Sequence, residues 1–199
     1  GFVKRMGIDL AECVDEASSF RSLRDVFERK IRYWETRPMN EDDSVVVSPA
    51  DSRMIVGSFR QASSLFIKNK FFTLKDLLGA KSGWPDAFSN GLFAVFRLTP
   101  DKYHYNHLPV SGIVRDFYEI EGNYHSCNPG VLITVAEPAS KNKRVITVID
   151  TDVEGGSGVG LVAMVEVAAL MIGDIVQCYS ENAYDSPVGI ERGMFVSRG

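Results

Sequence analysis

Residues 112–120, GIVRDFYEI, are rich in β-branched and aromatic side chains and predict a strand, which Gly122 and Asn123 end as turn formers. The same composition returns in residues 144–149, RVITVI. Further runs of this kind are Val45 to Val47, Met54 to Phe59, Leu92 to Leu98 and Val131 to Glu137. Because Gly, Pro and Asn turns separate these short runs, we expect a largely antiparallel sheet or sandwich.

The N-terminal part of the chain has a different pattern. Apolar residues recur at a spacing of about 3.6 between Leu10 and Trp34, with charged residues between them, which predicts one or two amphipathic helices. Pro38 and the polar residues 40–43 end this region. A short helix is expected from Thr73 to Leu78, with Thr73 as its cap. The predicted fold class is therefore α+β, with N-terminal amphipathic helices followed by a largely antiparallel β sandwich or sheet.

Length and composition favour one domain. The chain has 199 residues, of which 45% are hydrophobic and 24% are charged, and this is enough for one sizeable core. We expect a single domain over residues 1–199, with a helical segment at 1–39 and a β-rich catalytic core at 40–199. The formal net charge of -4 and the absence of a Lys and Arg cluster in the sequence do not predict a nucleic-acid partner.

Cysteine usage and hydropathy indicate the compartment. Cys13, Cys127 and Cys178 are odd in number and widely spaced, so neither a disulfide framework nor a structural zinc site is predicted. The N-terminus does not read as a signal peptide. The longest apolar run, Gly158 to Gly173, contains Glu166 and is shorter than the roughly 20 residues that a membrane-spanning helix needs. We expect a cytoplasmic protein without a transmembrane helix, and contact with the membrane surface stays open.

Two of the three histidines, His104 and His107, lie within four residues of sequence, three positions apart, between Pro100 and Pro109. If Pro100 begins a helical turn, both imidazoles lie on the same side of it. Imidazole transfers protons near neutral pH, so such a pair suggests acid–base chemistry. The alternative is a pair of histidines that are hydrogen-bonded within a loop.

A metal site is the second alternative for the histidine pair. His104 and His107 together with His125 or Asp116 would provide three ligands. The spacing matches no established zinc signature, and we expect no metal.

Asp51 is the acid that we associate with the histidines. It follows the strand-like run Val45 to Val47 in a turn, and a carboxylate in such a turn could orient a histidine as in a Ser-His-Asp triad. The alternative is that Asp51 only forms the turn.

Read together, these segments resemble the phosphatidylserine decarboxylase family. Residues 98–112, LTPDKYHYNHLPVSG, are similar to the family's Leu-x-Pro-x-Asp-Tyr-His-x-x-His-x-Pro-x-x-Gly block, which is the most specific signal. Ser48-Pro49-Ala50-Asp51 is similar to its Ser-Pro-Ala-Asp-Gly motif. The resemblance continues through Phe27-Glu28-Arg29-Lys30, Arg37-Pro38, Asn128-Pro129, Arg144-Val145 and Asp150-Thr151.

The resemblance implies a proenzyme that cleaves itself at a Gly-Ser bond, which leaves a covalent pyruvoyl group on a small chain. That small chain is expected after residue 199. The pyruvoyl ketone would form a Schiff base with the amine of phosphatidylserine or a related amino acid and promote loss of its carboxylate. By the same resemblance, Asp51 and His107 would activate the serine for self-cleavage, and His104 would assist decarboxylation. A homodimer is compatible with this assignment.

Five further residues are candidates for substrate binding. Tyr105, Tyr124, His125 and Ser126 combine aromatic surface with polar groups. Glu166 lies in an apolar run, where a carboxylate needs a partner or a role, and the alternatives are a salt bridge to Arg115 or a similar residue and a contact with a polar substrate. The competing functions are a free L-amino-acid decarboxylase of the same family, a non-catalytic relative and a zinc-dependent hydrolase.

Overall fold

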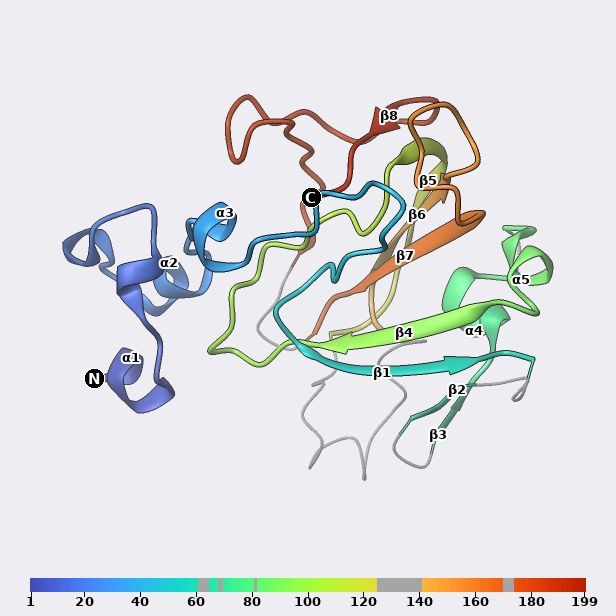
Figure 1. Ribbon diagram of the computed structural model, residues 1–199. Coiled ribbons are helices and arrows are strands. Elements are labelled where there is room, and N and C mark those ends of the chain that lie inside the picture. The colour runs from blue at the N-terminus through green and yellow to red at the C-terminus, as the bar shows by residue number, and fades with distance from the viewer. Residues whose placement is uncertain (61–64, 68–69, 81, 125–140, 170–173) are drawn as a thin grey trace.

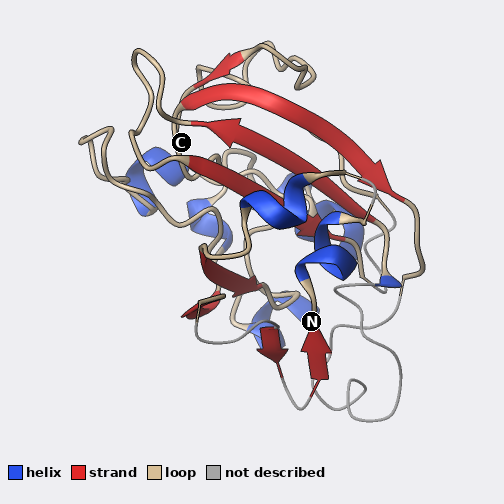
Figure 2. Cartoon of the chain, turned by 90° about the vertical axis from the view of Figure 1, so that its right-hand side faces the viewer, coloured by secondary structure: helices blue, strands red, loops and turns tan. Residues whose placement is uncertain are grey.

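A four-stranded antiparallel sheet is the largest element of the computed structural model, which describes residues 1–199 except 61–64, 68–69, 81, 125–140 and 170–173 (Figure 1). Its strands are β5 (Gly112–Ile120), β6 (Arg144–Asp150), β7 (Leu161–Val167) and β8 (Phe195–Val196), in the order β7-β6-β5-β8. Figure 2 shows that these strands curl along their length. The strands expected at 112–120 and 144–149 are therefore confirmed.

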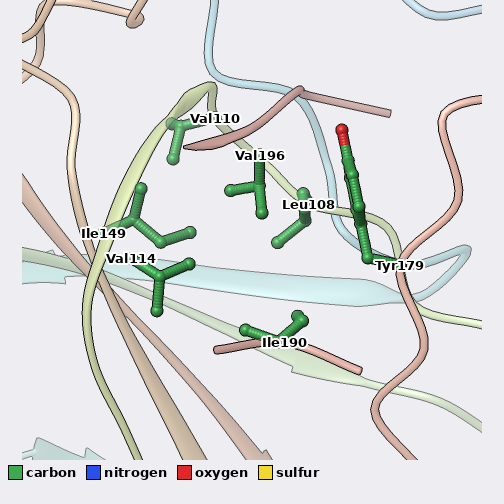
Figure 3. Close-up of a cluster of buried hydrophobic side chains, with 7 residues drawn as sticks. All are labelled: Leu108, Val110, Val114, Ile149, Tyr179, Ile190 and Val196. Carbon is green, nitrogen blue, oxygen red and sulfur yellow. The ribbon is translucent and has the colours of Figure 1, made fainter. Parts of the chain in front are cut away.

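Strand β6 is buried on both faces of this sheet. On one face, Ile146 and Val148 pack against Leu78 of helix α4 (Leu74–Leu78) and Trp84 of helix α5 (Trp84–Ala87). On the other face, Ile149 packs in a cluster with Leu108, Val110, Val114, Tyr179, Ile190 and Val196 (Figure 3). A strand that is covered on both faces needs a near-continuous apolar run, which RVITVI supplies.

The remaining described strands form two small antiparallel sheets. Strand β1 (Arg53–Ser58) pairs with β4 (Leu92–Arg97), and β2 (Leu65–Ile67) pairs with β3 (Lys70–Phe72). The predicted helix cap is confirmed, because the Thr73 hydroxyl accepts from the Asp76 backbone at 3.0 Å and the Asp76 carboxylate accepts from the Thr73 backbone at 3.0 Å. The strand expected at Val131 to Glu137 lies outside the described residues.

The N-terminal segment is less helical than the sequence predicts. It contains the helices α1 (Phe2–Met6), α2 (Leu23–Phe27) and α3 (Tyr33–Thr36) and the 3-10 turns Leu10–Glu12 and Ala17–Ser19. One or two long amphipathic helices from Leu10 to Trp34 are therefore not present. In Figure 1 this segment lies to one side of the sheets.

Local capping and a β-bridge between residues distant in the sequence explain the short helices. The Asp9 carboxylate caps the first 3-10 turn, and a capping box between Ser22 and Asp25 begins α2 anew. Cys13 pairs with Ile31 in an isolated β-bridge, and both side chains are buried. These two side chains are thus covered through a contact between distant positions rather than along one helix face, while Val14, Leu23 and Trp34 are exposed.

The expected strand at Val45 to Val47 is also wrong. This segment has no strand, although the Val47 N–H donates to the Pro109 carbonyl at 3.0 Å.

The structure confirms an α+β chain with a curled antiparallel sheet, while the sandwich and the single-domain boundary stay predictions. In the part of the chain that the structure describes, no helix is long and apolar enough to cross a membrane.

Candidate active site

Residues 103–108 form no helix, so the predicted helical turn that places both imidazoles on one side is wrong. A single turn closes at Thr99, whose carbonyl accepts from the Lys102 N–H at 2.9 Å. Beyond it the backbone is tied to a different segment, because the His107 N–H donates to the Pro49 carbonyl at 2.8 Å. This bond and the one from Val47 to Pro109 bring the Ser-Pro-Ala-Asp motif alongside the histidine segment.

His107 is enclosed by aromatic rings. Its ring centroid is 4.4 Å from that of Tyr33, in an edge-on arrangement, and 5.7 Å from that of Tyr103. Burial lowers the pKa of His107, and a hydrogen bond to the backbone of Gly199 acts in the opposite direction. The imidazole is therefore neutral at pH 7 and is able to accept a proton.

Gly199 is held beside His107 by a second contact. The Gly199 N–H donates to the carbonyl of Leu108 at 3.0 Å. Residue 199 thus contacts two consecutive positions of the histidine segment, through the His107 side chain and the Leu108 backbone. In Figure 1 its position, marked C, is close to the chain that leaves α3.

His104 lies in a different environment. Its ring stacks on Phe27, with a centroid separation of 3.9 Å. Burial lowers the pKa of His104 to about 4, while a hydrogen bond to the Thr99 backbone raises it and the positive charge of Arg29 lowers it. The Nε2 atom of His104 is buried without a hydrogen-bond partner among the described residues. Such an atom is available to a ligand.

Asp51 is oriented by Arg37. The Arg37 Nε and one terminal nitrogen both donate to Oδ2 of Asp51 at 3.2 Å. The same guanidinium binds both carboxylate oxygens of Glu12 at 3.1 Å. No hydrogen bond between the side chains of Asp51 and His107 is present in the described structure, so their link passes through the Pro49 backbone. Arg37 thereby connects the N-terminal segment to the motif.

An aromatic cluster supports the histidine segment from the N-terminal side. The Tyr184 hydroxyl donates to the Ile31 carbonyl at 2.9 Å and accepts from the Ile31 N–H at 3.1 Å. The Tyr103 hydroxyl is 2.6 Å from that of Tyr184, and with the latter's proton committed to Ile31, Tyr103 is the donor. Tyr105 stacks on Tyr103 and meets Tyr184 edge-on. Tyr105 thus belongs to the aromatic cluster that reaches His107 through Tyr103.

Glu166 is bonded by amides rather than by an arginine. Its Oε1 accepts from Nδ2 of Asn106 at 2.8 Å, and its Oε2 accepts from Gln177. The predicted salt bridge to Arg115 is wrong, because Arg115 pairs with Asp150 at 3.1 Å. Burial raises the pKa of Glu166 and the two amide hydrogen bonds lower it. The contact with Asn106 places Glu166 next to the histidine segment.

Comparison with known proteins agrees with this geometry. Residues 23–199 match the phosphatidylserine decarboxylase family. The chain belongs to this family. It is 35% identical over 203 residues to a phosphatidylserine decarboxylase proenzyme of Chlamydia trachomatis and 30% identical over 199 residues to that of Fusobacterium nucleatum, with 100% of this chain covered in both. It is 35% identical over 196 residues to phosphatidylserine decarboxylase proenzyme 2 of rice, with 96% of this chain covered.

The family members are longer than this chain. It spans 65% of the Chlamydia protein, 64% of the Fusobacterium protein and 30% of the rice protein. The family resemblance found in the motif segments is therefore confirmed over nearly the whole chain.

The remaining predicted site residues are Tyr124, His125 and Ser126, of which the structure describes only Tyr124. Tyr124 is exposed, and no hydrogen bond or ring contact in the described structure joins it to His104 or His107. His125 and Ser126 lie outside the described residues. Among the residues that are described, no group of three or more His, Cys, Asp or Glu side chains is arranged to hold a metal ion.

Sequence reasoning missed three residues of this site. Arg37 could have been found, because Arg37-Pro38 is part of the segment that resembles the family. Tyr184 and Gln177 have no comparable local signal, since each acts through a contact with a residue far away in the sequence.

Proposed function

We propose that this chain is the large chain of a self-cleaving, pyruvoyl-dependent decarboxylase, a carboxy-lyase. The observation that carries the proposal is the contact of Gly199 with His107, which lies alongside the Ser-Pro-Ala-Asp motif in a family whose relatives are named proenzymes. In the precursor, the residues that follow Gly199 would begin beside a neutral imidazole. A serine hydroxyl delivered there would meet a proton acceptor.

His107 and Asp51 are the proposed residues of self-cleavage. A neutral His107 would take the proton of the serine hydroxyl as it attacks the preceding carbonyl. Asp51 would stabilise the resulting imidazolium through its negative charge, and Arg37 would fix the direction of its carboxylate. The backbone bond from His107 to Pro49 keeps the two motifs in register.

The residues present fit a pyruvoyl group. His104 offers a buried Nε2 without a partner in the described structure; because the other ring nitrogen bonds the Thr99 backbone, Nε2 of the neutral imidazole can accept a hydrogen bond or a proton from a substrate group. When bound, the pyruvoyl group would supply a ketone that reacts with a substrate amine and withdraws electrons from the carboxylate that leaves. His104 would hold or transfer a proton at Nε2, and its apolar neighbour Phe27 would exclude water.

The proposed substrate carries an amine and a carboxylate on the same carbon. Phosphatidylserine is the first candidate, because the relatives are named for it. A free L-amino acid is the second candidate, since the polar contact between Glu166 and Asn106 adjoins the histidine segment. We propose Tyr105, Tyr124, His125, Ser126 and Glu166 as substrate-binding residues.

The proposed partner is the small chain of the same precursor. Relatives exceed this chain in length by a third or more of their own sequence. The β1–β4 pair exposes Met54, Ile55, Val56 and Leu92, which is a large apolar area for a two-stranded sheet. We propose that the small chain covers this pair and completes the sandwich. Val56→Lys should then weaken co-purification of the two chains, while unchanged co-purification would exclude this face.

The experiment that tests the proposed function uses the full-length precursor. Intact mass should show two chains, and the small chain should carry a carbonyl that reacts with phenylhydrazine. Carbon dioxide release is then measured from phosphatidylserine in vesicles and from a panel of free L-amino acids. One uncut chain without a reactive carbonyl would reject the proposal and favour a non-catalytic relative, whereas activity that chelators abolish would favour a zinc-dependent hydrolase.

A further inference from the structure

Residues 197–199 are held by an unusual series of hydrogen bonds. Strand β8 pairs with β5 only at Phe195 and Val196, so the regular ladder ends there. Beyond it, the Ser197 N–H donates to the Tyr179 hydroxyl at 2.7 Å, and the Arg198 N–H donates to the Ser111 hydroxyl at 2.9 Å. Two consecutive backbone donors are therefore satisfied by side chains rather than by a neighbouring strand.

This series has a direction. Because β8 runs antiparallel to β5, with Val196 opposite Gly112, the segment after Val196 runs back along the residues that precede Gly112. It passes Ser111, and its Gly199 N–H reaches the Leu108 carbonyl at 3.0 Å. Gly199 therefore lies beside His107.

Both hydroxyl groups are fixed in place. Ser111 is buried, its N–H donates to the Ser157 hydroxyl at 2.9 Å, and its carbonyl accepts from the Ser157 N–H at 3.0 Å. Tyr179 is buried in the cluster drawn in Figure 3, where its ring stands beside Leu108. Its backbone is paired with Val188 through hydrogen bonds of 2.7 and 2.8 Å. Neither acceptor can follow the segment if the segment moves.

The side chain of Arg198 fastens the same segment from outside. It is 6% exposed, and its two terminal nitrogens donate to the Asn40 carbonyl and to the Asp43 carboxylate. This contact ties residue 198 to the loop that precedes the Ser-Pro-Ala-Asp motif. The backbone and the side chain of the segment are thus held independently.

We propose that Ser111 and Tyr179 are positioning residues for self-cleavage, which hold residues 197–199 so that the following peptide reaches His107. This inference rests on the proposed function. Without either hydroxyl, a part-buried backbone N–H of this segment loses its acceptor, and the segment is free to shift towards another one. A shift of about 1 Å in a reacting group is enough to slow a reaction strongly.

The test measures the rate of self-cleavage in the full-length precursor after refolding or synthesis. Tyr179→Phe keeps the ring and removes only the hydroxyl, and Ser111→Ala does the same for Ser111. We expect each variant to cleave roughly tenfold more slowly, which corresponds to the loss of one hydrogen bond near the reacting bond. Tyr118→Phe is the matched control, because the Tyr118 hydroxyl donates to the Leu78 carbonyl at 2.7 Å away from this segment, and it should cleave at the original rate.

A second pair of variants separates positioning from general damage to the fold. Ser111→Thr and Ser111→Val have the same shape, and only the threonine keeps a hydroxyl acceptor. The threonine variant should cleave faster than the valine variant, and the fraction of any variant that has cleaved should decarboxylate normally per carbonyl group.

The possible outcomes distinguish this inference from the proposed function. If the unaltered precursor cleaves and both Tyr179→Phe and Ser111→Ala cleave at its rate, the positioning role is wrong and the proposed function stands. Equal rates for the threonine and valine variants would also overturn it. If the unaltered precursor never cleaves, both conclusions fail. Should Ser111→Ala not fold, Tyr179→Phe against Tyr118→Phe decides the question.

Discussion

The surroundings of His104 and His107 differ although the two residues are neighbours in sequence. His107 is joined through its backbone to Pro49 and through its side chain to Gly199, so it touches two segments that are distant in the sequence. His104 stacks on Phe27 and keeps a buried nitrogen without a partner among the described residues. The His107 side chain is hydrogen-bonded to the backbone of Gly199, whereas Nε2 of His104 has no hydrogen-bond partner in the described structure.

This difference teaches that the two histidines need not share one task. A histidine in contact with Gly199 suits self-cleavage at a bond that follows in the precursor, a reaction that happens once and within the protein. A histidine with an open nitrogen suits repeated proton transfer to a substrate. The predictions below test whether the two tasks can be separated.

His107→Ala should have the largest effect. Without the imidazole the proposed base beside Gly199 is lost, so self-cleavage of the full-length precursor should fall by at least about 100-fold. Mass spectrometry of the precursor over time measures this. Asp51→Ala should act in the same direction through the lost negative charge, and normal processing of His107→Ala would refute the assignment.

His104→Ala should separate the two tasks most clearly. We expect this variant to cleave itself at least partly, because no hydrogen bond or ring contact joins His104 to residues 197–199 in the described structure. Its decarboxylation per carbonyl group should fall by about 100-fold or more, the usual effect of removing an acid–base residue. Equal losses of cleavage and decarboxylation would mean that the two histidines act as one unit.

The pH dependence of stability should also distinguish His104. Its pKa is about 4 in the folded chain, against an ordinary value of about 6.5, so the unfolded chain binds more protons between these values. Stability should therefore decrease as the pH falls from about 6.5 towards 4, by up to about 3 kcal/mol from this group alone.

Urea unfolding at several pH values measures this effect. His104→Gln should make the free energy of unfolding less sensitive to pH over the same interval. A variant with an unchanged pH dependence would show that the low pKa of His104 is not the cause. Titration of both histidines by NMR in the processed enzyme should place both below about 6.5.

Glu166→Gln is expected to have the smallest effect. The amide side chain would bring an NH2 group toward the amides of Asn106 and Gln177, which now donate to the carboxylate. Substrate affinity should fall by roughly tenfold while self-cleavage stays unchanged. Glu119→Gln is the control, because Glu119 pairs with Lys143 at the surface. Unchanged substrate preference and affinity in Glu166→Gln would exclude Glu166 from substrate binding.

The sequence predicted the central elements of the fold because their signals are local. The strands at 112–120 and 144–149 follow from β-branched composition, and Thr73 caps α4 through an atom three residues away. The same local reasoning failed for Leu10 to Trp34, where the chain forms short helices and a bridge between Cys13 and Ile31 instead of one helix face. Val26 and Ile31 of this period are buried but Val14, Leu23 and Trp34 are exposed, so the period did not predict which residues the fold covers.

The sequence alone determined the family, because motif residues and their order are written in the chain itself, and from the same motifs it predicted His104, His107 and Asp51 as site residues. Only the tertiary structure decided that His107 meets Gly199, that Arg37 holds Asp51 and that Glu166 is bonded by amides. Each of these contacts joins residues far apart along the chain. Such pairs depend on how the sheet and the N-terminal segment pack, and no local propensity encodes that packing.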